Sequence, residues 1–231
     1  MRNASVLVVA DVTTATVADA CIRCDVPLRA APAGVLPVVG GTRVAGRVLP
    51  ARHYGSVDVF LEAFADAEPG DVLVVDNGGR LDEACVGDLT ILEARAAGVA
   101  AVIVWGLHRD TQQLVELGLP VWSYGAHPVG PTRLDDRDGA PVRIGDWIVT
   151  REDVVVADDD GVVFVPRDRV DQVLAAAREI GRIEREQAAR IAGGETLRAQ
   201  TQFDEYLARR AADPAYTFRA HLRRIGGAIE E

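Results

Sequence analysis

The sequence contains no lysine, and all 25 of its basic residues are arginines. Arginine stays protonated in proteins and cannot form a Schiff base. Enzymes that hold a carbonyl substrate or pyridoxal on a lysine are therefore excluded, and so is the phosphate-binding P-loop with its lysine. Any chemistry on a carbonyl compound must depend on a metal ion or on proton transfer by other side chains.

Cysteine is also scarce, with only three in the chain. An odd number without a secretion signal indicates a reducing compartment, so we expect a cytoplasmic protein. The apolar run Val6–Ala10 stops at Asp11 and does not resemble a signal peptide. Cys21 and Cys24 form a lone CxxC at the end of a predicted helix, without a second pair, so we expect neither a zinc site nor a redox role.

Long hydrophobic runs are absent, and the longest, Val99–Gly106, suits a buried strand rather than the roughly 20 residues of a membrane span. The formal net charge is −10, which argues against binding to nucleic acid or to an anionic membrane. We therefore expect a small-molecule partner, bound at a locally basic site if it is an anion. With 231 residues, 48% of them hydrophobic, the chain can form one large domain with an appendage.

The first two thirds of the chain alternate between strands and helices. We expect helices over residues 13–23, 56–64 (with Ser56 as the N-cap), 88–98 and 109–117. We expect strands over residues 42–52, 72–76, 99–105 and 121–124. This alternation predicts a layered α/β domain with a largely parallel segment.

From Val142 the pattern changes to strands alone, and Asp158–Gly161 has the composition of a hairpin turn. Beyond Pro166 the chain becomes helical, with a break at Gly193–Gly194. We therefore predict a mixed α/β domain over residues 1–166. A helical extension over residues 167–231 would pack on that domain or on a neighbouring subunit.

Common catalytic motifs are missing: neither the GxGxxG of dinucleotide-binding folds nor the GxSxG of hydrolases occurs. The four histidines lack metal-ligand spacing, and we interpret them as ordinary surface or loop residues: His53, His108, His127 and His221.

Two short segments combine groups that could bind an anion and a metal. Gly87-Asp88 and Arg109-Asp110 both stand at predicted strand-to-helix junctions, where open α/β sheets place their ligands. Helix N-termini and an arginine suit a carboxylate or an oxyanion, and two aspartates suit a hydrated Mg²⁺. The structural alternative is that Asp88 only caps a helix and that Arg109 and Asp110 only form a surface ion pair.

A third segment also follows a predicted strand. Asp76, Asn77 and Arg80 stand in or beside a glycine-rich turn. They could line the same pocket or simply form the turn, and the sequence leaves both interpretations open.

Several stretches resemble the RraA-like family, which contains the regulator of ribonuclease E activity A and divalent-metal pyruvate aldolases. The similarity covers most of residues 13–180 and is carried by Thr14–Ala20, Gly41–Gly46, Pro69–Asp76, Ala84–Leu89, Gly98–Asp110, Leu119–Val121 and Ala157–Val162. The resemblance implies a β/β/α sandwich of the swivelling-domain type. It also implies a homotrimer or homohexamer with sites between subunits.

Within that family the aldolases resemble this chain in having an aspartate, twenty residues and then Arg-Asp, here Asp88, Arg109 and Asp110. The resemblance implies that Asp110 binds Mg²⁺ or Mn²⁺, that Arg109 stabilises a pyruvate enolate, and that Asp88 takes part in proton transfer. The segment Gly87-Asp88-Leu89-Thr90 would receive the carboxylate of a 2-oxo acid substrate. This chain departs from the family at His108, where a valine or small apolar residue often precedes the arginine.

The implied activity is cleavage of 4-hydroxy-4-methyl-2-oxoglutarate or 4-carboxy-4-hydroxy-2-oxoadipate to pyruvate and a second 2-oxo acid. Three alternatives remain. Decarboxylation of oxaloacetate passes through the same enolate, and a specialised biosynthetic lyase could use the same scaffold. The chain could also be a non-catalytic regulator that binds a ribonuclease or helicase.

Overall fold

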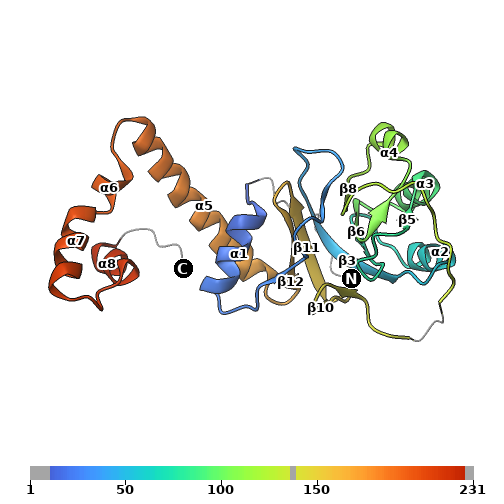
Figure 1. Cartoon of the computed structure of the whole chain (residues 1–231), viewed down its shortest axis with the longest axis horizontal. Helices are drawn as coiled ribbons and strands as arrows, with labels where there is room; N and C mark the ends of the chain where they lie inside the picture. Colours follow the sequence, from blue (N-terminus) through green and yellow to red (C-terminus); the bar gives the residue numbers. More distant parts are fainter. Residues whose placement is uncertain (1–10, 136–138, 227–231) are drawn as a thin grey trace.

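The computed structural model describes residues 11–135 and 139–226, so the apolar run 6–10 lies outside the described residues. A curled sheet of eight strands runs through the molecule in the order β1-β12-β11-β3-β4-β6-β8-β2 (Figure 1). Its strands are β1 (Arg29–Ala30), β2 (Leu36–Pro37), β3 (Val44–Arg52), β4 (Val72–Asp76), β6 (Ala101–Trp105), β8 (Val121–Ser123), β11 (Asp153–Asp158) and β12 (Gly161–Pro166).

Strand β3 joins two halves of the sheet. Its first residues pair antiparallel with β11, and its last residues pair parallel with β4. The parallel half continues through β6 and β8, whereas β11 and β12 form an antiparallel hairpin. The predicted mixed α/β class is confirmed, including the turn at Asp158–Gly161.

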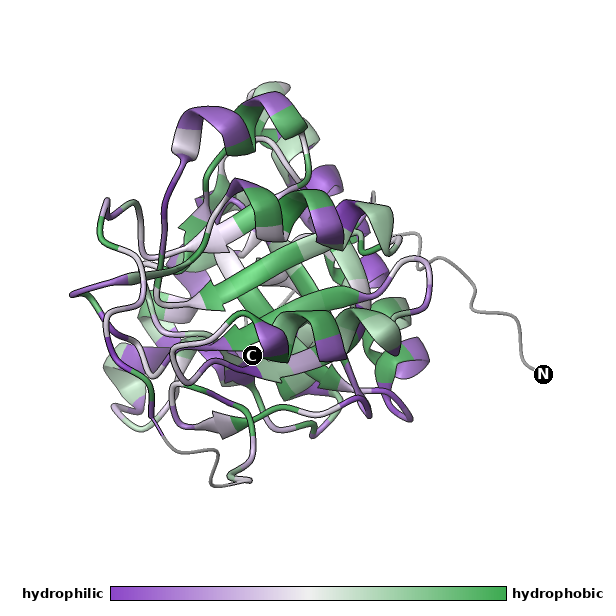
Figure 2. Cartoon of the chain, turned by 90° about the vertical axis from the view of Figure 1, so that its right-hand side faces the viewer, coloured by the Kyte–Doolittle hydropathy of each residue, from purple (hydrophilic) through white to green (hydrophobic). Residues whose placement is uncertain are grey.

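The two halves of the sheet pack face to face between two layers of helices. Helices α2 (Asp58–Ala65), α3 (Asp88–Ala96) and α4 (Thr111–Leu117) cover the parallel half, and α1 (Thr14–Arg23) and α5 (Val170–Ala192) cover the hairpin (Figure 1). Between them, side chains from β4, β6 and β8 meet those from β11 and β12. The strands therefore lie in the interior, as their hydrophobic colour in Figure 2 shows.

The alternation of side chains along each strand explains these layers. On β11, Val154 and Val156 pack toward α1 and α5, while Val155 and Ala157 face the other half of the sheet. Successive strand residues point to opposite faces, so a strand buried on both faces becomes a continuous apolar run. All six residues of β11 are buried.

Helix starts follow local hydrogen bonding. Helix α1 lies within the predicted range 13–23, and the side chain of its N-cap, Thr13, accepts from the amide of Thr16. The predicted N-cap at Ser56 is wrong, because α2 begins at Asp58 with Val57 as its N-cap. The carboxylate of Asp58 accepts from the amide of Val59 at 3.0 Å, a bond that a Ser56 cap would otherwise supply.

Two further pairs of short strands extend beyond the main sheet. Strands β9 (Arg143–Ile144) and β10 (Trp147–Ile148) form a small hairpin. Strands β5 (Ala84–Val86) and β7 (Leu107–His108) run parallel to each other. Each of these two parallel strands leads directly into a helix, α3 or α4, so they determine where the predicted site residues meet.

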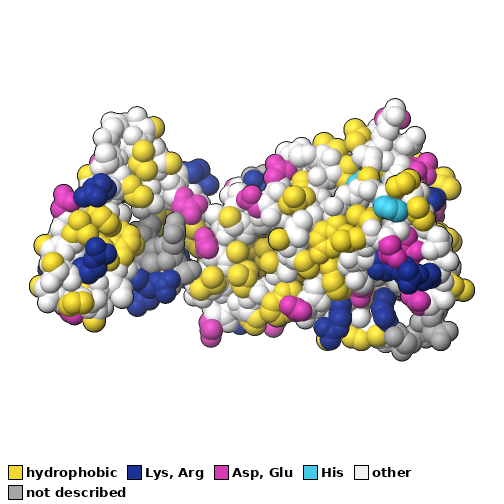
Figure 3. Space-filling view, in the orientation of Figure 1, with side chains coloured by type: hydrophobic (Ala, Val, Ile, Leu, Met, Phe, Trp, Pro, Cys, Tyr) yellow, Lys and Arg dark blue, Asp and Glu magenta, His cyan; other side chains and the backbone are white. Residues whose placement is uncertain are grey.

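The C-terminal third begins within the core and then leaves it. The first turns of α5 share a hydrophobic cluster with α1, but its exposed second half carries α6 (Leu197–Gln200), α7 (Phe203–Ala212) and α8 (Phe218–Ile225) away from the sheet (Figure 1). We call residues 182–226 the C-terminal arm. Arginines and apolar side chains are both prominent on its visible face (Figure 3).

The arm has a small core of its own. The ring of Tyr206 lies 5.0 Å from that of Phe218 and 5.7 Å from that of His221. Phe203 and Tyr216 complete the cluster. The first half of α5 packs on the domain that precedes it, and the boundary at residue 166 stays a prediction.

Among the described residues, the helices are too short or too polar to span a membrane.

Three of the four histidines are not surface residues, so that part of our interpretation is wrong. His53, His108 and His221 are at least 92% buried, because tertiary packing covers them. The cysteines are free, and burial raises the pKa of Cys21 to about 11. This thiol stays protonated at neutral pH.

Candidate active site

The parallel pair β5 and β7 brings the two predicted segments together. Val86 at the end of β5 lies opposite His108 at the end of β7, and the amide of Arg109 donates to the carbonyl of Val86 at 2.9 Å. Helix α3 begins one residue beyond Gly87, and α4 begins directly after Asp110. Residues separated by about twenty positions in the sequence therefore become neighbours.

A backbone amide and a guanidinium group converge on one carboxylate oxygen. Oδ2 of Asp110 accepts from the amide of Asp88 at 3.3 Å and lies 3.4 Å from Nε of Arg109. The Arg109 side chain is 47% exposed and that of Asp110 is 33% exposed. Both remain open to solvent, so a ligand can reach them.

The backbone of Asp110 adopts a left-handed conformation, with φ of 60° and ψ of 39°. Few residues other than glycine accept this conformation, although aspartate and asparagine do so more readily than most. Such conformations cost free energy and are concentrated at functional sites. Here the conformation makes the turn between β7 and α4 and directs the carboxylate toward Gly87 and Arg109.

Two glycines make room for these side chains. A Cβ added at Gly87 would lie 2.4 Å from Oδ2 of Asp110 and 3.1 Å from Nε of Arg109. A Cβ at Gly130 would lie 2.5 Å from Nη1 of Arg109. The guanidinium therefore lies between two glycines on different segments, and only the first of them was selected from the sequence.

The segment Gly87–Thr90 was predicted to receive a substrate carboxylate. Two of its amides already face carboxylates, because the amide of Leu89 donates to Oδ1 of Asp88 at 2.7 Å while that of Asp88 contacts Asp110. An incoming carboxylate would have to replace these contacts. The Leu89 side chain is 75% exposed beside them, and Thr90 lies partly buried one residue further along α3.

His108 lies directly behind the exposed pair. Its Nδ1 is 2.7 Å from Oγ of Ser123, and its Nε2 is 3.0 Å from Oγ1 of Thr111. Burial lowers the pKa of His108, against the opposing effect of the Asp110 carboxylate. The ring is therefore neutral at pH 7 and binds the two hydroxyls.

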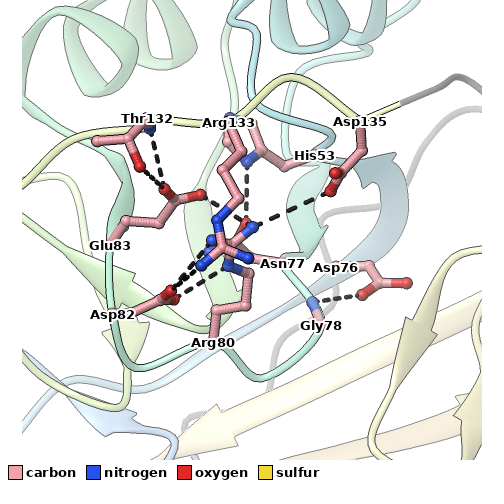
Figure 4. Close-up of polar contacts among 10 residues, drawn as sticks. All are labelled: His53, Asp76, Asn77, Gly78, Arg80, Asp82, Glu83, Thr132, Arg133 and Asp135. Carbon is pink, nitrogen blue, oxygen red and sulfur yellow. Dashed lines mark hydrogen bonds and ion pairs between the residues drawn. The ribbon is translucent and has the colours of Figure 1, made fainter.

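The third predicted segment forms a separate network (Figure 4). Asp76 accepts from the amides of Gly78 and Arg143 at 2.9 and 2.8 Å, and Asn77 contacts Nδ1 of His53 at 2.9 Å. Arg80 pairs with Asp82. The polar contacts of Asp76, Asn77 and Arg80 thus hold loops in place, and they run to residues other than the Asp88–Arg109–Asp110 group.

One carboxylate in this network is connected to the candidate site. Glu83 is 1% exposed, and its Oε2 accepts from the amide and the hydroxyl of Thr132 at 2.9 and 3.1 Å. Its Oε1 pairs with Arg80 at 3.2 Å (Figure 4). Thr132 follows Gly130 closely, so Glu83 fastens the segment against which Arg109 rests. Sequence analysis missed this residue, because nothing in the local pattern shows that its partner lies 49 positions away.

The site offers few ligands for a metal. No group of three or more histidine, cysteine, aspartate or glutamate ligands occurs among residues 11–135 and 139–226. Within the same residues, Oδ1 of Asp110 accepts no hydrogen bond, and its carboxylate is partly exposed. One hard oxygen ligand with open space suits Mg²⁺ or Mn²⁺, because such ions keep several of their waters. The donor set therefore fits a hydrated divalent cation.

Comparison with protein families gives a direct assignment. Residues 14–164 match the model of the RraA-like family, described as Aldolase/RraA. The chain belongs to the RraA-like family, as its sequence features predicted.

Individual relatives carry names of two kinds. A Laribacter hongkongensis protein named "Putative 4-hydroxy-4-methyl-2-oxoglutarate aldolase" is 32% identical over 157 residues, which are 64% of this chain and 94% of that protein. A Halalkalibacterium halodurans protein of the same name is 29% identical over 52% of this chain, and the match spans 57% of its own length. Legionella pneumophila DlpA is 27% identical over 71% of this chain but only 28% of DlpA.

A solved structure shares the fold. Streptomyces coelicolor RraAS2, described as an unusual member of the RNase ES inhibitor RraA protein family, superposes with a TM-score of 0.68 at 27% identity. The superposition covers 79% of this chain and 95% of RraAS2. The chain thus resembles proteins named as aldolases and a protein described as a member of an RNase inhibitor family.

Proposed function

We propose that this protein is a lyase that requires a divalent metal and releases pyruvate from a 4-hydroxy-2-oxo acid. The observation that carries the proposal is the contact of the Asp88 amide and the Arg109 guanidinium with the strained, partly exposed Asp110 carboxylate, in the space that Gly87 leaves free. The relatives named as aldolases support the same class of reaction. Substrates of the 4-hydroxy-4-methyl-2-oxoglutarate and 4-carboxy-4-hydroxy-2-oxoadipate type fit a site that combines an arginine with a metal-binding carboxylate.

Each side chain has a defined task in this proposal. Asp110 offers Oδ1 to Mg²⁺ or Mn²⁺, and a bound cation would act as a Lewis acid toward the keto oxygen of the substrate. Arg109, held between two glycines, donates hydrogen bonds to the enolate oxygen that develops as the carbon–carbon bond breaks. Asp88, acting through a water molecule, takes the proton of the 4-hydroxyl group as the carbon–carbon bond breaks and returns it to C3 of the enolate, which becomes pyruvate.

The beginning of α3 binds the other end of the substrate in this proposal. The amides of Asp88 and Leu89 now face carboxylates of the chain. A substrate carboxylate would take over these bonds and gain from the positive end of the helix dipole. Thr90 adds a hydroxyl to the same turn. Because the chain has no lysine, a Schiff-base route is not available to it, which supports the metal-dependent one.

The test is pyruvate release from 4-carboxy-4-hydroxy-2-oxoadipate and from oxaloacetate, measured with Mg²⁺, with Mn²⁺ and after chelation. We expect release from at least one compound that stops on chelation and returns with metal. The relative rates would separate aldol cleavage from decarboxylation as the main activity. If neither compound releases pyruvate in the presence of metal, the proposal is contradicted for these substrates.

Matched variants identify the residues responsible. Asp110→Asn keeps the size of the side chain and tolerates the left-handed backbone, so its loss of activity would reflect the lost charge. Arg109→Lys should lower the rate about a hundredfold, because an ammonium group cannot reproduce the planar fork. Glu116→Gln, at an exposed position on α4, is the control and should leave the rate unchanged.

A second candidate function is regulation of an RNA-processing enzyme, which the similarity to RraAS2 favours. A regulator would bind its partner through surface contacts and would not need Asp110. Binding to a ribonuclease or helicase that survives in Asp110→Asn, together with no pyruvate release, would favour this function.

We also propose that the chain works as a homotrimer or homohexamer with its C-terminal arm on a neighbouring subunit. Residues 182–226 carry nine arginines and six acidic residues, whereas residues 1–181 carry 16 arginines and 27 acidic residues. Opposite charges on the arm and the core support contact between copies. Light scattering after size exclusion should give three or six times the chain mass of 24.7 kDa, and a monomer would contradict this proposal.

A further inference from the structure

The buried histidine behind the site connects three elements of the fold. Ser123 ends β8, His108 ends β7, and Thr111 begins α4. The His108 ring contacts a hydroxyl on each side, at 2.7 Å to Ser123 and 3.0 Å to Thr111. We call these three residues the histidine clasp.

Every polar group of His108 has a partner. Its amide donates to the carbonyl of Gly125 at 3.0 Å, and its carbonyl accepts from the amide of His127 at 2.8 Å. A neutral imidazole has one donor and one acceptor nitrogen, and a hydroxyl can serve either. A buried ring whose polar groups are all hydrogen-bonded has little freedom to move, even though Thr111 itself is exposed. The ring is therefore fixed in position as well as in orientation.

The clasp closes around the left-handed residue of the site. His108 lies two positions before Asp110, and Thr111 lies directly after Asp110. The contact between the side chains of His108 and Thr111 therefore bridges the turn. The turn is also held by the contacts of Oδ2 of Asp110 with the Asp88 amide and with Arg109, and by backbone hydrogen bonds. Arg109 donates to Val86 at 2.9 Å, and Leu114 donates to the carbonyl of Asp110 at 3.0 Å. A sparsely populated backbone conformation persists only where its surroundings enforce it.

We propose that His108 is a positioning residue, which holds the Asp110 carboxylate in the orientation that a divalent cation requires. It acts through Thr111 and touches neither substrate nor metal. The effect of the clasp on metal binding rests on the proposed function.

The first test removes one hydrogen bond without changing shape. Thr111→Val replaces the hydroxyl by a methyl group, and Thr111→Ser retains the hydroxyl. Calorimetric titration with Mn²⁺ in the absence of substrate should show about a tenfold loss of affinity in Thr111→Val, as for other residues that orient metal ligands. Thr111→Ser should return to within about twofold of the natural protein. Equal affinity in all three proteins would overturn the inference.

A double-mutant cycle tests whether His108 and Thr111 act through the same contact. His108→Val alone should weaken Mn²⁺ binding at least as much as Thr111→Val. The second substitution should then add less than about twofold, because coupled residues are not additive. If the two losses of Mn²⁺ affinity multiply in the double variant, the two residues act separately and the clasp is overturned. Thr217→Val, which removes the N-cap of α8 far along the chain, is the control and should leave Mn²⁺ affinity unchanged.

Hydrogen exchange separates this inference from the proposed function. Thr111→Val should increase amide exchange in residues 109–114 and leave residues 72–76 of β4 unaffected. This measurement needs neither metal nor substrate. A natural protein without Mn²⁺ affinity would contradict the proposed function, and unchanged exchange in residues 109–114 would overturn the clasp whether or not Mn²⁺ binds.

Discussion

The carboxylate of Glu83 accepts hydrogen bonds from both the amide and the hydroxyl of Thr132, at 2.9 and 3.1 Å (Figure 4). This contact joins the start of β5 to the segment that contains Gly130. The other end of β5 leads to Gly87, so one buried carboxylate holds both walls of the space that Arg109 occupies. The position of an exposed catalytic candidate thus depends on a residue that is 1% exposed.

Replacing Glu83 should affect stability and activity together. Glu83→Ala removes the carboxylate that accepts from the amide of Thr132 and pairs with Nη1 of Arg80. This loss should lower the free energy of unfolding by about 2 kcal/mol. Glu83→Gln keeps an acceptor for Thr132 and should cost less. Urea unfolding measures both changes. Equal stability of the alanine and glutamine variants would contradict the assigned role of the hydrogen bonds to Thr132.

Adding one methyl group at Gly87 should disturb the site with little effect on the fold. The Cβ of Gly87→Ala would approach Oδ2 of Asp110 to 2.4 Å, so the Asp110 or Arg109 side chain must move. The backbone at Gly87 has φ of −140°, which alanine accepts. We expect at least a tenfold loss of pyruvate release with a melting temperature within a few degrees of the natural protein.

The control for this change is Gly40→Ala. Its Cβ would meet only the side chain of Asp159 at 3.7 Å, an ordinary contact. Activity should be retained there. A fully active Gly87→Ala protein would show that the close approach of Gly87 to Asp110 has no part in the reaction.

The buried His53 should make stability depend on pH. Burial lowers the pKa of His53, and this effect outweighs the hydrogen bond to Asn77 and the nearby Glu83 carboxylate, which act in the opposite direction. The unfolded chain therefore binds the proton more readily, so the free energy of unfolding falls as pH drops below about 6.5. The largest contribution of one histidine is about 1.4 kcal/mol per pH unit.

Unfolding in urea between pH 7.5 and 5 measures this dependence. His53→Gln removes the group and should reduce the slope in that interval, although His108 still contributes to it through its own lowered pKa. His127→Gln, at a partly exposed position, serves as the comparison. An unchanged slope in His53→Gln would show that this histidine does not carry the dependence.

The small core of the C-terminal arm should unfold independently of the sheet. Tyr206 contacts the rings of Phe203, Tyr216, Phe218 and His221 and is 7% exposed. Tyr206→Ala removes the centre of this cluster, at a local cost of about 3 kcal/mol or more. Hydrogen exchange should rise across residues 197–225 and stay unchanged in β4 and β6. A uniform rise over the whole chain would show that the arm and the sheet unfold together.

Much of the fold follows from periodicity alone. Strand β4 has the predicted bounds, Val72–Asp76, because a short apolar run between a turn and a glycine pair has few alternatives. Helix α1 is similarly well defined by its capping threonine and its apolar face. The start of α2 could not be predicted to the residue, because serine and aspartate compete for the same amide hydrogen bonds.

The chemistry of the candidate site could be predicted from the sequence, but the residues that hold the site in place could not. The spacing of Asp88 and Arg109-Asp110 predicted two adjacent junctions, and the segments do lie side by side, but through the pairing of β5 with β7, two short strands that the sequence did not predict. The roles of these residues in binding and catalysis stay a prediction. Glu83 and Gly130 hold the site through contacts that involve a loop. A loop has no periodic sequence pattern from which such contacts could be predicted.

The left-handed backbone at Asp110 has a consequence for how this site can change over evolutionary time. Aspartate, asparagine and glycine are the residues that accept a φ near 60° most readily, and only aspartate among them carries a charge. A glutamate would offer the same functional group on a longer chain, but it would have to pay the conformational penalty at this turn. A substitution at position 110 must therefore preserve the shape of the main chain as well as the proposed ligand atom, whereas Asp88 lies in the first turn of a regular helix, where most residues fit the backbone.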